Sequence, residues 1–312
     1  MVNGLVVSPL QNNGIRPYSQ GRATIGYCHM DVISLSLFET PLAVLLLMVF
    51  LLGAVIGSFL NVIIYRVPNG TSVVFPKSCC INCKSPIRPW HNIPVLGWLI
   101  LRGRCADCKA SISFRYPLVE LLTGVITVLV ITEFGFSVYS LTALGFSFIV
   151  VPLIFIDAEH MLLPNRLTFP LALLTLCYRI MEATALLGSD DLATKGQHES
   201  SFIDALVGVA VGAGSLFLIS KLWRLARGTD GMGMGDVKMM VGIGLMLGGA
   251  KTFLTLFLAA LIGSILGIVF AKSRGKSLQV KIPFGIFLGS SSLVALLWGD
   301  QIISWYLGFF RL

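Results

Sequence analysis

The sequence has 312 residues, of which 55% are hydrophobic and 12% are charged, and its mean hydropathy is +0.86. These values lie outside the range of soluble domains and predict a polytopic membrane protein whose apolar surface faces lipid. The formal net charge of +8 does not indicate a nucleic-acid partner, because Lys and Arg form no clustered stripe with interleaved aromatic residues.

The N-terminal residues 1–38 form a mostly polar extension. They contain no early apolar core preceded by basic residues, so we do not interpret them as a cleaved signal peptide. Met30 offers a natural start close to the first span, and residues 1–29 are then either a disordered extension or a mis-assigned beginning. N-terminal sequencing of the native protein decides between these possibilities.

Apolar runs long enough to cross a bilayer define the rest of the chain. The sixth run is short and rich in glycine, which is typical of a broken or tilted element, and the tail from Gln301 to Phe310 has the composition of an interfacial segment. The sequence therefore predicts an all-α membrane bundle of about eight spans. These runs are 41–64, 117–132, 139–156, 167–187, 203–222, 237–250, 252–271 and 283–298.

Basic residues predict the orientation. Between Tyr65 and Tyr116 the single acid is Asp107, which marks this segment as cytoplasmic by the positive-inside rule. The basic loops at 221–227 and 272–281 fall on the same side if the spans alternate, whereas the intervening loops are poor in Lys and Arg. The basic residues of the first segment are Arg66, Lys77, Lys84, Arg88, Arg102, Arg104, Lys109 and Arg115.

Four of the seven cysteines form two C-x-x-C knuckles, Cys80 with Cys83 and Cys105 with Cys108, separated by 21 residues. This spacing is typical of a four-thiolate zinc site, and a reducing cytosol favours metal over disulfides. Four thiolates leave no open position for water, so the zinc is predicted to be structural. Redox-active or unliganded thiols remain alternatives. Cys79 offers a second register that does not give two matching knuckles.

Two acids adjoin apolar runs on the predicted cytoplasmic side: Asp157 in FIDAEHMLLPN and Asp236 in GMGMGDVKMM. Two carboxyl groups that share a site do not both ionise easily, so the pair can supply an acid and a base at one pH. That combination hydrolyses a peptide bond without a covalent intermediate. We expect Gly233 and Gly235 to permit unusual backbone angles and the close approach of an extended substrate.

Each of these features also has an ordinary structural interpretation. A lone aspartate at the end of a span is commonly interfacial, and a Gly-x-Gly sequence is common where membrane helices pack closely. Glu159 and His160 are expected to be solvated loop residues, and Lys238 either biases the local electrostatics or faces the headgroups.

Several motifs in chain order resemble those of the bacterial type IV prepilin peptidases, which are GxGD-type intramembrane aspartic proteases. A departure is Ile81, because the family often has proline after the first cysteine; the ligand spacing is unaffected. The resemblance runs from about Gly57 to Lys238, and the following spans fit the family's membrane core. It rests on GSFLNVIIYRVP at 57–68, the two knuckles with Asn92-Ile93-Pro94 and RGRCADC, SISFRYPLVELLTG at 111–124, Leu163-Pro164-Asn165, Thr168 and GMGMGD at 231–236.

The resemblance implies that Asp157 and Asp236 are the catalytic aspartates. It implies cleavage of the basic leader of prepilins or type II secretion pseudopilins, after a glycine and on the cytoplasmic face of the bacterial inner membrane. Many members then N-methylate the new terminal residue with S-adenosylmethionine, and the zinc loop and the segment from Gly57 to Asn61 accompany the members with both functions. The residues themselves identify no site for this cofactor.

Within the resemblance, the alternative is a peptidase that does not methylate. Two other classes remain open: an ion or proton transporter that uses the aspartates as a relay, and an assembly factor that binds pilin segments without cutting them. The predicted domains are an extension at 1–38, a first span at 39–65, a zinc-binding cytosolic loop at 66–116 and a peptidase core at 117–312.

Overall fold

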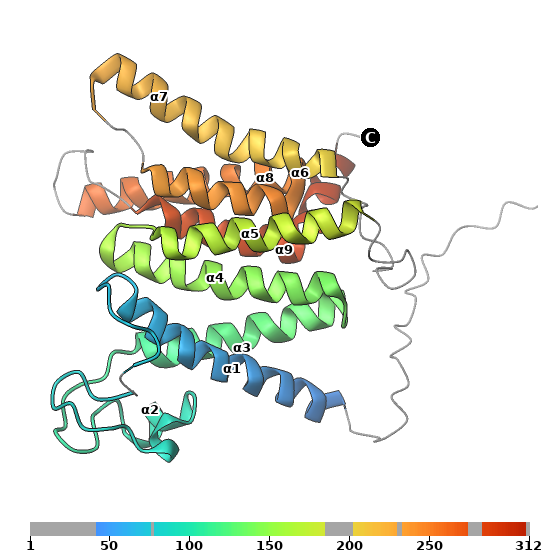
Figure 1. The fold of residues 1–312 in the computed structure, drawn as a ribbon. Helices are drawn as coiled ribbons and strands as arrows, with labels where there is room; N and C mark the ends of the chain where they lie inside the picture. Colours follow the sequence, from blue (N-terminus) through green and yellow to red (C-terminus); the bar gives the residue numbers. More distant parts are fainter. Residues whose placement is uncertain (1–41, 76–77, 185–201, 230–232, 274–282, 310–312) are drawn as a thin grey trace, which may run out of the picture. The chain divides into compact units, whose positions relative to one another are not determined.

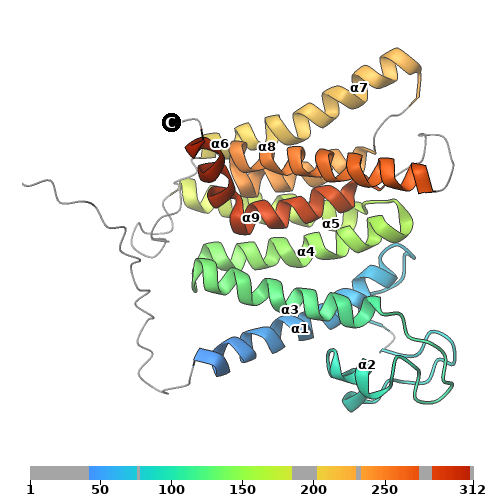
Figure 2. The same cartoon turned by 180° about the vertical axis from the view of Figure 1, so that it is seen from behind.

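The computed structural model describes residues 42–75, 78–184, 202–229, 233–273 and 283–309. The extension predicted at 1–38 and most of the basic loop at 272–281 lie outside the described residues. Within them the backbone is helical, with two isolated β-bridges and no strand, so the predicted all-α fold is confirmed (Figures 1 and 2).

The first long helix, α1, is followed by a small insert that contains one 3₁₀ turn, η1, and one short helix, α2. The remaining long helices follow, and α6, the π-helical turn η2 and α7 succeed one another without a break. The elements are α1 (Leu42–Arg66), η1 (Pro89–Asn92), α2 (Leu96–Ile100), α3 (Arg115–Phe134), α4 (Val138–His160), α5 (Asn165–Ala183), α6 (Phe202–Val209), η2 (Ala210–Gly214), α7 (Ser215–Arg227), α8 (Met234–Ser273) and α9 (Phe284–Gly308).

The ends of α4 are set by local signals. At its start, the side chain of Ser137 accepts a hydrogen bond from the Ser140 amide while the Ser140 hydroxyl accepts one from the Ser137 amide, which makes a reciprocal cap. At its end, Met161 adopts the left-handed conformation, and Pro164 then precedes α5. Only residues 161–164 separate the two helices, so the last turn of α4 lies at the same end of the bundle as the first turn of α5.

Small residues allow α1 and α3 to pack closely, as is common between membrane helices. A Cβ atom at Gly57 would lie 2.8 Å from the Cα atom of Glu120, and one at Gly124 would lie 2.6 Å from the Phe50 ring. The Asn61 amide donates a hydrogen bond of 3.0 Å to the Tyr116 carbonyl. Gly57 and Asn61, which belong to the GSFLN motif, therefore serve helix packing and an interhelical hydrogen bond.

Helix α8 changes direction at Gly248, which has φ 74° and ψ −178°. Met240 and Thr252 lie on opposite sides of this residue, yet both side chains would contact a Cβ atom at Gly212, at 2.7 and 2.8 Å. A straight helix would separate twelve residues by about 18 Å, so the two arms of α8 fold back on each other. This bend agrees with the broken element expected from the glycine-rich sixth run.

Charged side chains hold the bend on both sides. The buried guanidinium of Arg179 donates hydrogen bonds of 2.8 and 2.9 Å to the carbonyls of Leu245 and Met246, at the end of the first arm. Asp204 accepts the Gly249 amide at 3.1 Å, at the start of the second arm. A cation at a helix C-terminus and an anion at an N-terminus are the pairings that the helix dipole favours.

Six helices of the described residues are long and apolar enough to cross a membrane: α1, α3, α4, the combined α6–α7, α8 and α9. Helix α5, with Arg179 and Glu182, is not among them, and α8 counts once although it bends. A multi-pass membrane protein is therefore confirmed, while the number of about eight spans stays a prediction. Helix α9 continues to Gly308, so the tail expected to be interfacial is part of a helix up to that residue.

Candidate active site and metal centre

Asp157 lies in the last turn of α4 and is only 5% exposed. Its Oδ2 atom accepts a hydrogen bond of 3.1 Å from the backbone amide of Ile286, in the first turn of α9. A Cβ atom at Gly285 would lie 2.8 Å from the same oxygen. The carboxylate therefore lies against the N-terminus of α9, where free amides favour an anion.

Asp236 lies in the first turn of α8 and is 8% exposed. Its backbone amide donates to the Gly233 carbonyl at 3.2 Å, and a Cβ atom at Gly233 would lie 3.5 Å from its Oδ2 atom. Among the described residues, none donates a hydrogen bond to the Asp236 carboxylate. The two aspartates are thus both buried, but they differ in their hydrogen-bond partners.

Leu163 connects the surroundings of the two aspartates. A Cβ atom at Gly235 would lie 2.8 Å from Leu163 Cβ, and one at Gly285 would lie 3.1 Å from Leu163 Cδ1. The Asp157 and Asp236 carboxyl groups are close enough to interact electrostatically. The structure therefore brings together two acids that are 79 positions apart in the sequence.

The glycines next to Asp236 act differently from the sequence-based expectation. Gly235 does not have a positive φ, so the left-handed backbone that would require a glycine is not found there. Gly235 is needed instead for a close approach, because the Leu163 side chain occupies the space that a Cβ atom would fill. The glycine is explained by packing between the α4–α5 connection and α8.

Charged groups around the aspartates pair with neighbouring elements. Glu159, expected to be a solvated loop residue, forms an ion pair with Arg115 at the start of α3. Lys238 donates a hydrogen bond of 2.9 Å to Asn165 Oδ1 at the start of α5, and its Nζ atom lies 5.4 Å from the centre of the Phe169 ring. The starts of α3, α5 and α8 are therefore linked to the same region as the end of α4.

Sequence reasoning missed the contribution of α9. Gly285 and Ile286 contact Asp157 directly, but they lie outside the two motifs that carry the aspartates. The signal that could have found them is Pro283, which stands immediately before α9 and is typical of the start of a helix.

The four cysteines of the knuckles converge on one point. One sulfur atom from each of Cys80, Cys83, Cys105 and Cys108 lies within 4.8 Å of the others, and the Sγ–Sγ distances are 3.8 Å for Cys80 to Cys108 and 4.0 Å for Cys83 to Cys105. Tetrahedral thiolates at the usual zinc–sulfur distance are about 3.8 Å apart. The sulfur positions therefore fit a zinc ion.

The two knuckles have the same local structure. In each, the first cysteine amide donates to a carbonyl five residues later, and the amide of a lysine donates back to the first cysteine: Lys84 in one knuckle and Lys109 in the other, with φ 60° and 59°. Cys79 instead forms a β-bridge with Pro86. Hydrogen bonding with Ser85 lowers the pKa of the Cys83 thiol to about 6, whereas burial and the other three thiols raise the pKa of Cys108 to about 11. The thiolate form that binds metal is therefore favoured at Cys83 but not at Cys108.

These observations define the class of protein: a multi-pass helical membrane protein with two adjacent buried aspartates at one end of its bundle and a four-cysteine insert after its first span. Two family models match the chain, the Bacterial Peptidase A24 N-terminal domain at residues 51–134 and the Type IV leader peptidase family at residues 143–268. The chain belongs to the type IV leader peptidase family, which is a family of proteases.

Curated relatives agree with this assignment. The chain is 38% identical to the prepilin leader peptidase/N-methyltransferase of Aeromonas hydrophila, over 83% of this chain and 93% of that protein. It is 37% identical to the protein of the same name from Pseudomonas aeruginosa, over 86% of this chain and 95% of that protein. It is 34% identical to the one from Neisseria gonorrhoeae, over 89% of this chain and 98% of that protein. No solved structure matches the chain.

Proposed function

We propose that this protein is an aspartic endopeptidase that removes the leader from type IV prepilins or from the pseudopilins of type II secretion. Asp157 and Asp236 are its catalytic pair. The observation that carries the proposal is the meeting of two buried carboxyl groups, from α4 and α8, around Leu163. The names of the relatives support the choice of substrate.

The two carboxyl groups act as a general base and a general acid. The ionised aspartate takes a proton from a water molecule as the water oxygen attacks the scissile carbonyl carbon, and the protonated aspartate donates a hydrogen bond to the carbonyl oxygen. The tetrahedral intermediate then breaks its C–N bond, and the proton taken from the water passes to the leaving amine. The Ile286 amide stabilises negative charge on Asp157. We therefore assign the base to Asp157 and the acid to Asp236.

The position of the pair at the helix ends suits a substrate that joins a soluble leader to an apolar helix. The excess of basic residues in the insert and the later loops supports a cytoplasmic position for this end, and the family resemblance supports the bacterial inner membrane. By resemblance to the family, the enzyme cuts after a glycine. The bond to be cut then lies at the membrane edge, at the same depth as the aspartates.

The four cysteines hold a zinc ion with a structural role. Cys80, Cys83, Cys105 and Cys108 are close enough to supply four ligands to one ion, and a tetrahedral zinc bound by all four would have no position left for a water molecule or a substrate. The ion fixes the two knuckles of an insert that has little core of its own.

The second activity is N-methylation of the new terminal residue, for which S-adenosylmethionine supplies the methyl group. It rests on the names of the relatives. No set of described residues identifies the cofactor site, and Gly57 and Asn61 are engaged in packing α1 against α3. We therefore assign no residue to this step, and a peptidase that does not methylate remains the alternative.

The test is cleavage of a purified prepilin in liposomes by the wild type, Asp157→Asn and Asp236→Asn, with and without S-adenosylmethionine, read by mass spectrometry. Removing a general acid or base typically lowers the rate by about 100- to 10,000-fold. Asp300→Asn is a matched control, because Asp300 is far from the active site. It is ion-paired with Lys251 and lies about 24 Å along α9 from the end of that helix that contacts Asp157.

Cleavage by both active-site variants at the wild-type rate would refute the aspartate pair. A gain of one methyl group on the product that requires S-adenosylmethionine supports the second activity, and cleavage without it identifies a peptidase only. Charge-dependent ion flux in the same liposomes without cleavage would favour a transporter. Binding of uncut prepilin by the wild type would favour an assembly factor.

A further inference from the structure

The insert lies beside the membrane helices rather than beyond their ends. The Val95 amide donates a hydrogen bond of 2.7 Å to the Glu120 carboxylate, and Glu120 is buried in α3, five residues after its start at Arg115. Five residues advance a helix by about 7.5 Å. Helix α2, which begins one residue after Val95, is therefore held at the level of the second turn of α3.

This position is fixed by several contacts. Val95 has φ 61°, which is rare for a β-branched residue and persists only where the surroundings hold it. A Cβ atom at Gly97 would lie 2.2 Å from the His91 carbonyl oxygen, and the Trp98 ring nitrogen donates to the Ile112 carbonyl at 3.0 Å. The outer face of α2 is consequently a rigid surface.

That surface is apolar and uncovered among the described residues. Leu96 is 53% exposed, Leu99 is 54% exposed and Ile100 is 66% exposed, and Trp90 in the preceding 3₁₀ turn is 59% exposed. Apolar side chains with a tryptophan are typical of segments that lie in the interface of a bilayer. We define these four residues as the α2 face.

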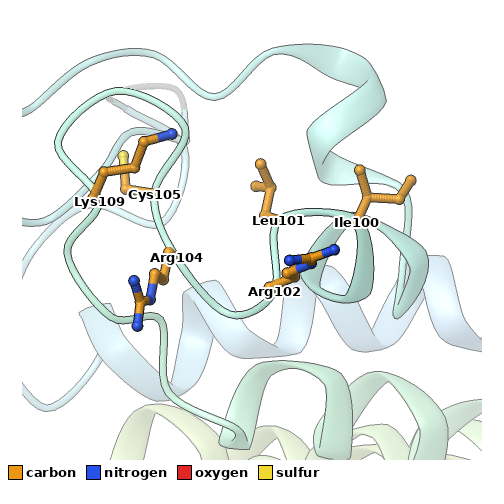
Figure 3. A pocket seen from close by; sticks show the side chains of 6 residues that line it. All are labelled: Ile100, Leu101, Arg102, Arg104, Cys105 and Lys109. Atoms are coloured by element: carbon orange, nitrogen blue, oxygen red, sulfur yellow. The ribbon is translucent and has the colours of Figure 1, made fainter.

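Next to the α2 face is a cavity of about 420 Å³. Figure 3 shows Ile100 and Leu101 on one side of it and Arg104, Cys105 and Lys109 on the other. Arg102 completes the lining, so the cavity has three cations and no acid. Among the described residues, no salt bridge involves these three side chains.

We propose that this cavity binds the phosphate group of an anionic phospholipid, whose acyl chains contact the α2 face. Three cations beside an apolar surface match the charge and the polarity of such a lipid. The Val95–Glu120 contact holds α2 beside the second turn of α3, and a position next to the end of a membrane-spanning helix suits a ligand that joins a headgroup to acyl chains. Each basic residue near an anionic membrane surface contributes about 1 kcal/mol, which corresponds to about a fivefold change in affinity.

The test uses the full-length protein with zinc bound, purified in detergent and titrated with phosphatidylglycerol or phosphatidylcholine. Bound lipid is counted by native mass spectrometry. We expect the wild type to prefer phosphatidylglycerol, and Arg102→Gln, Arg104→Gln and Lys109→Gln each to weaken its binding about fivefold. The combined Arg102→Lys and Arg104→Lys variant keeps the charge and retains binding within about threefold.

Lys84 provides a matched control. It follows the first knuckle as Lys109 follows the second, with nearly the same φ, but it does not line the cavity. Lys84→Gln should therefore leave lipid binding unchanged. Zinc content is measured for every variant. If a Gln variant has lost its metal, lipid binding by the combined Arg102→Lys and Arg104→Lys variant tests the site instead.

Three results would overturn the proposal. Equal affinity for the two lipids would remove the role of the anionic headgroup, and an equal loss in Lys84→Gln would show only a general effect of charge. Competition by inorganic phosphate or by an acidic peptide at the same concentration as the lipid would identify a site for soluble anions. A separate measurement tests whether the α2 face contacts acyl chains. Quenching of tryptophan fluorescence by brominated lipids is compared between the wild type and Trp90→Phe, and equal quenching in both would also overturn the proposed depth.

Discussion

The two candidate sites are assembled in different ways. The metal centre consists of one local turn used twice, and each turn is closed by hydrogen bonds within a few residues. The aspartate site combines the end of α4, the 161–164 connection, the start of α8 and the start of α9, and the Ile286–Asp157 hydrogen bond spans 129 positions. The first site therefore depends on spacing and metal, and the second on how closely helices pack.

The comparison predicts that small additions to the helix packing will damage the aspartate site most. In Gly285→Ala the new methyl group would lie 2.8 Å from Asp157 Oδ2 and 3.1 Å from Leu163 Cδ1. The carboxylate must then move, and a displacement of about 1 Å typically costs a catalytic group about 100-fold in rate. We expect prepilin cleavage to fall by about this factor, measured as initial rate in liposomes.

Gly308→Ala is the matched control, since Gly308 also lies in α9 and a Cβ atom there would meet no atom within 4 Å. It should cleave at the wild-type rate and bind zinc normally. Wild-type cleavage by Gly285→Ala would contradict the proposed packing of α9 against Asp157.

A smaller effect is expected from removing one hydrogen bond. Ile286→Pro deletes the amide that donates to Asp157; the residue lies in the first turn of α9, where amides have no intrahelical partner, so no helical hydrogen bond is lost. Hydrogen bonds to charged groups contribute about 1.5–3 kcal/mol, so we expect the cleavage rate to fall about tenfold or more. Ile286→Val keeps the amide and should cleave normally; equal rates in the two variants would exclude the amide's role.

The difference between the sites also explains what the sequence could predict. The two cysteine knuckles follow from their spacing, because a knuckle is a local structure and its geometry is nearly independent of the rest of the fold. The all-α class follows from the long apolar runs, and the break in α8 from its glycines. For these features, residues near in sequence contain the relevant information.

The surroundings of the aspartates could not be derived in the same way. That Asp157 and Asp236 adjoin was a hypothesis from their positions at span ends, but Gly285 and Ile286 depend on how α9 packs. Likewise, Glu159 is exposed as expected, but it also pairs with Arg115, a partner 44 positions away that the sequence does not indicate. Gly235 was expected to permit the close approach of a substrate, which stays a prediction, and the group that lies against it in the structure is Leu163.

Loss of a knuckle cysteine should abolish metal binding with little effect on cleavage. Cys80→Ser removes one of the four converging ligands, and serine is a poor zinc ligand, so we expect zinc to fall from about one ion per chain to near none. The aspartate site shares no residue with the knuckles, so the cleavage rate should stay within about threefold of the wild type. Zinc is measured by elemental analysis of the purified protein.

Cys79→Ser is the matched control, because Cys79 is adjacent in sequence but lies outside the converging set. It should retain its zinc. If it loses zinc while Cys80→Ser keeps it, the register of the first knuckle is wrong. A cleavage loss in Cys80→Ser as large as that in Gly285→Ala would show that the two sites are not separate.

Among the variants near the aspartates, the smallest effect is expected at Lys238, which joins the start of α8 to the start of α5 through Asn165. Lys238→Met removes the hydrogen bond and keeps most of the side-chain length. An exposed hydrogen bond contributes about 1 kcal/mol or less, so cleavage should fall no more than about fivefold. If the bond acts only through Asn165, the double variant with Asn165→Ala should be no slower than Lys238→Met alone. A contrary result would be a loss of about 100-fold in cleavage by Lys238→Met while Asn165→Ala cleaves near the wild-type rate. The lysine would then act on the aspartates themselves, and the site would contain three charged groups rather than two.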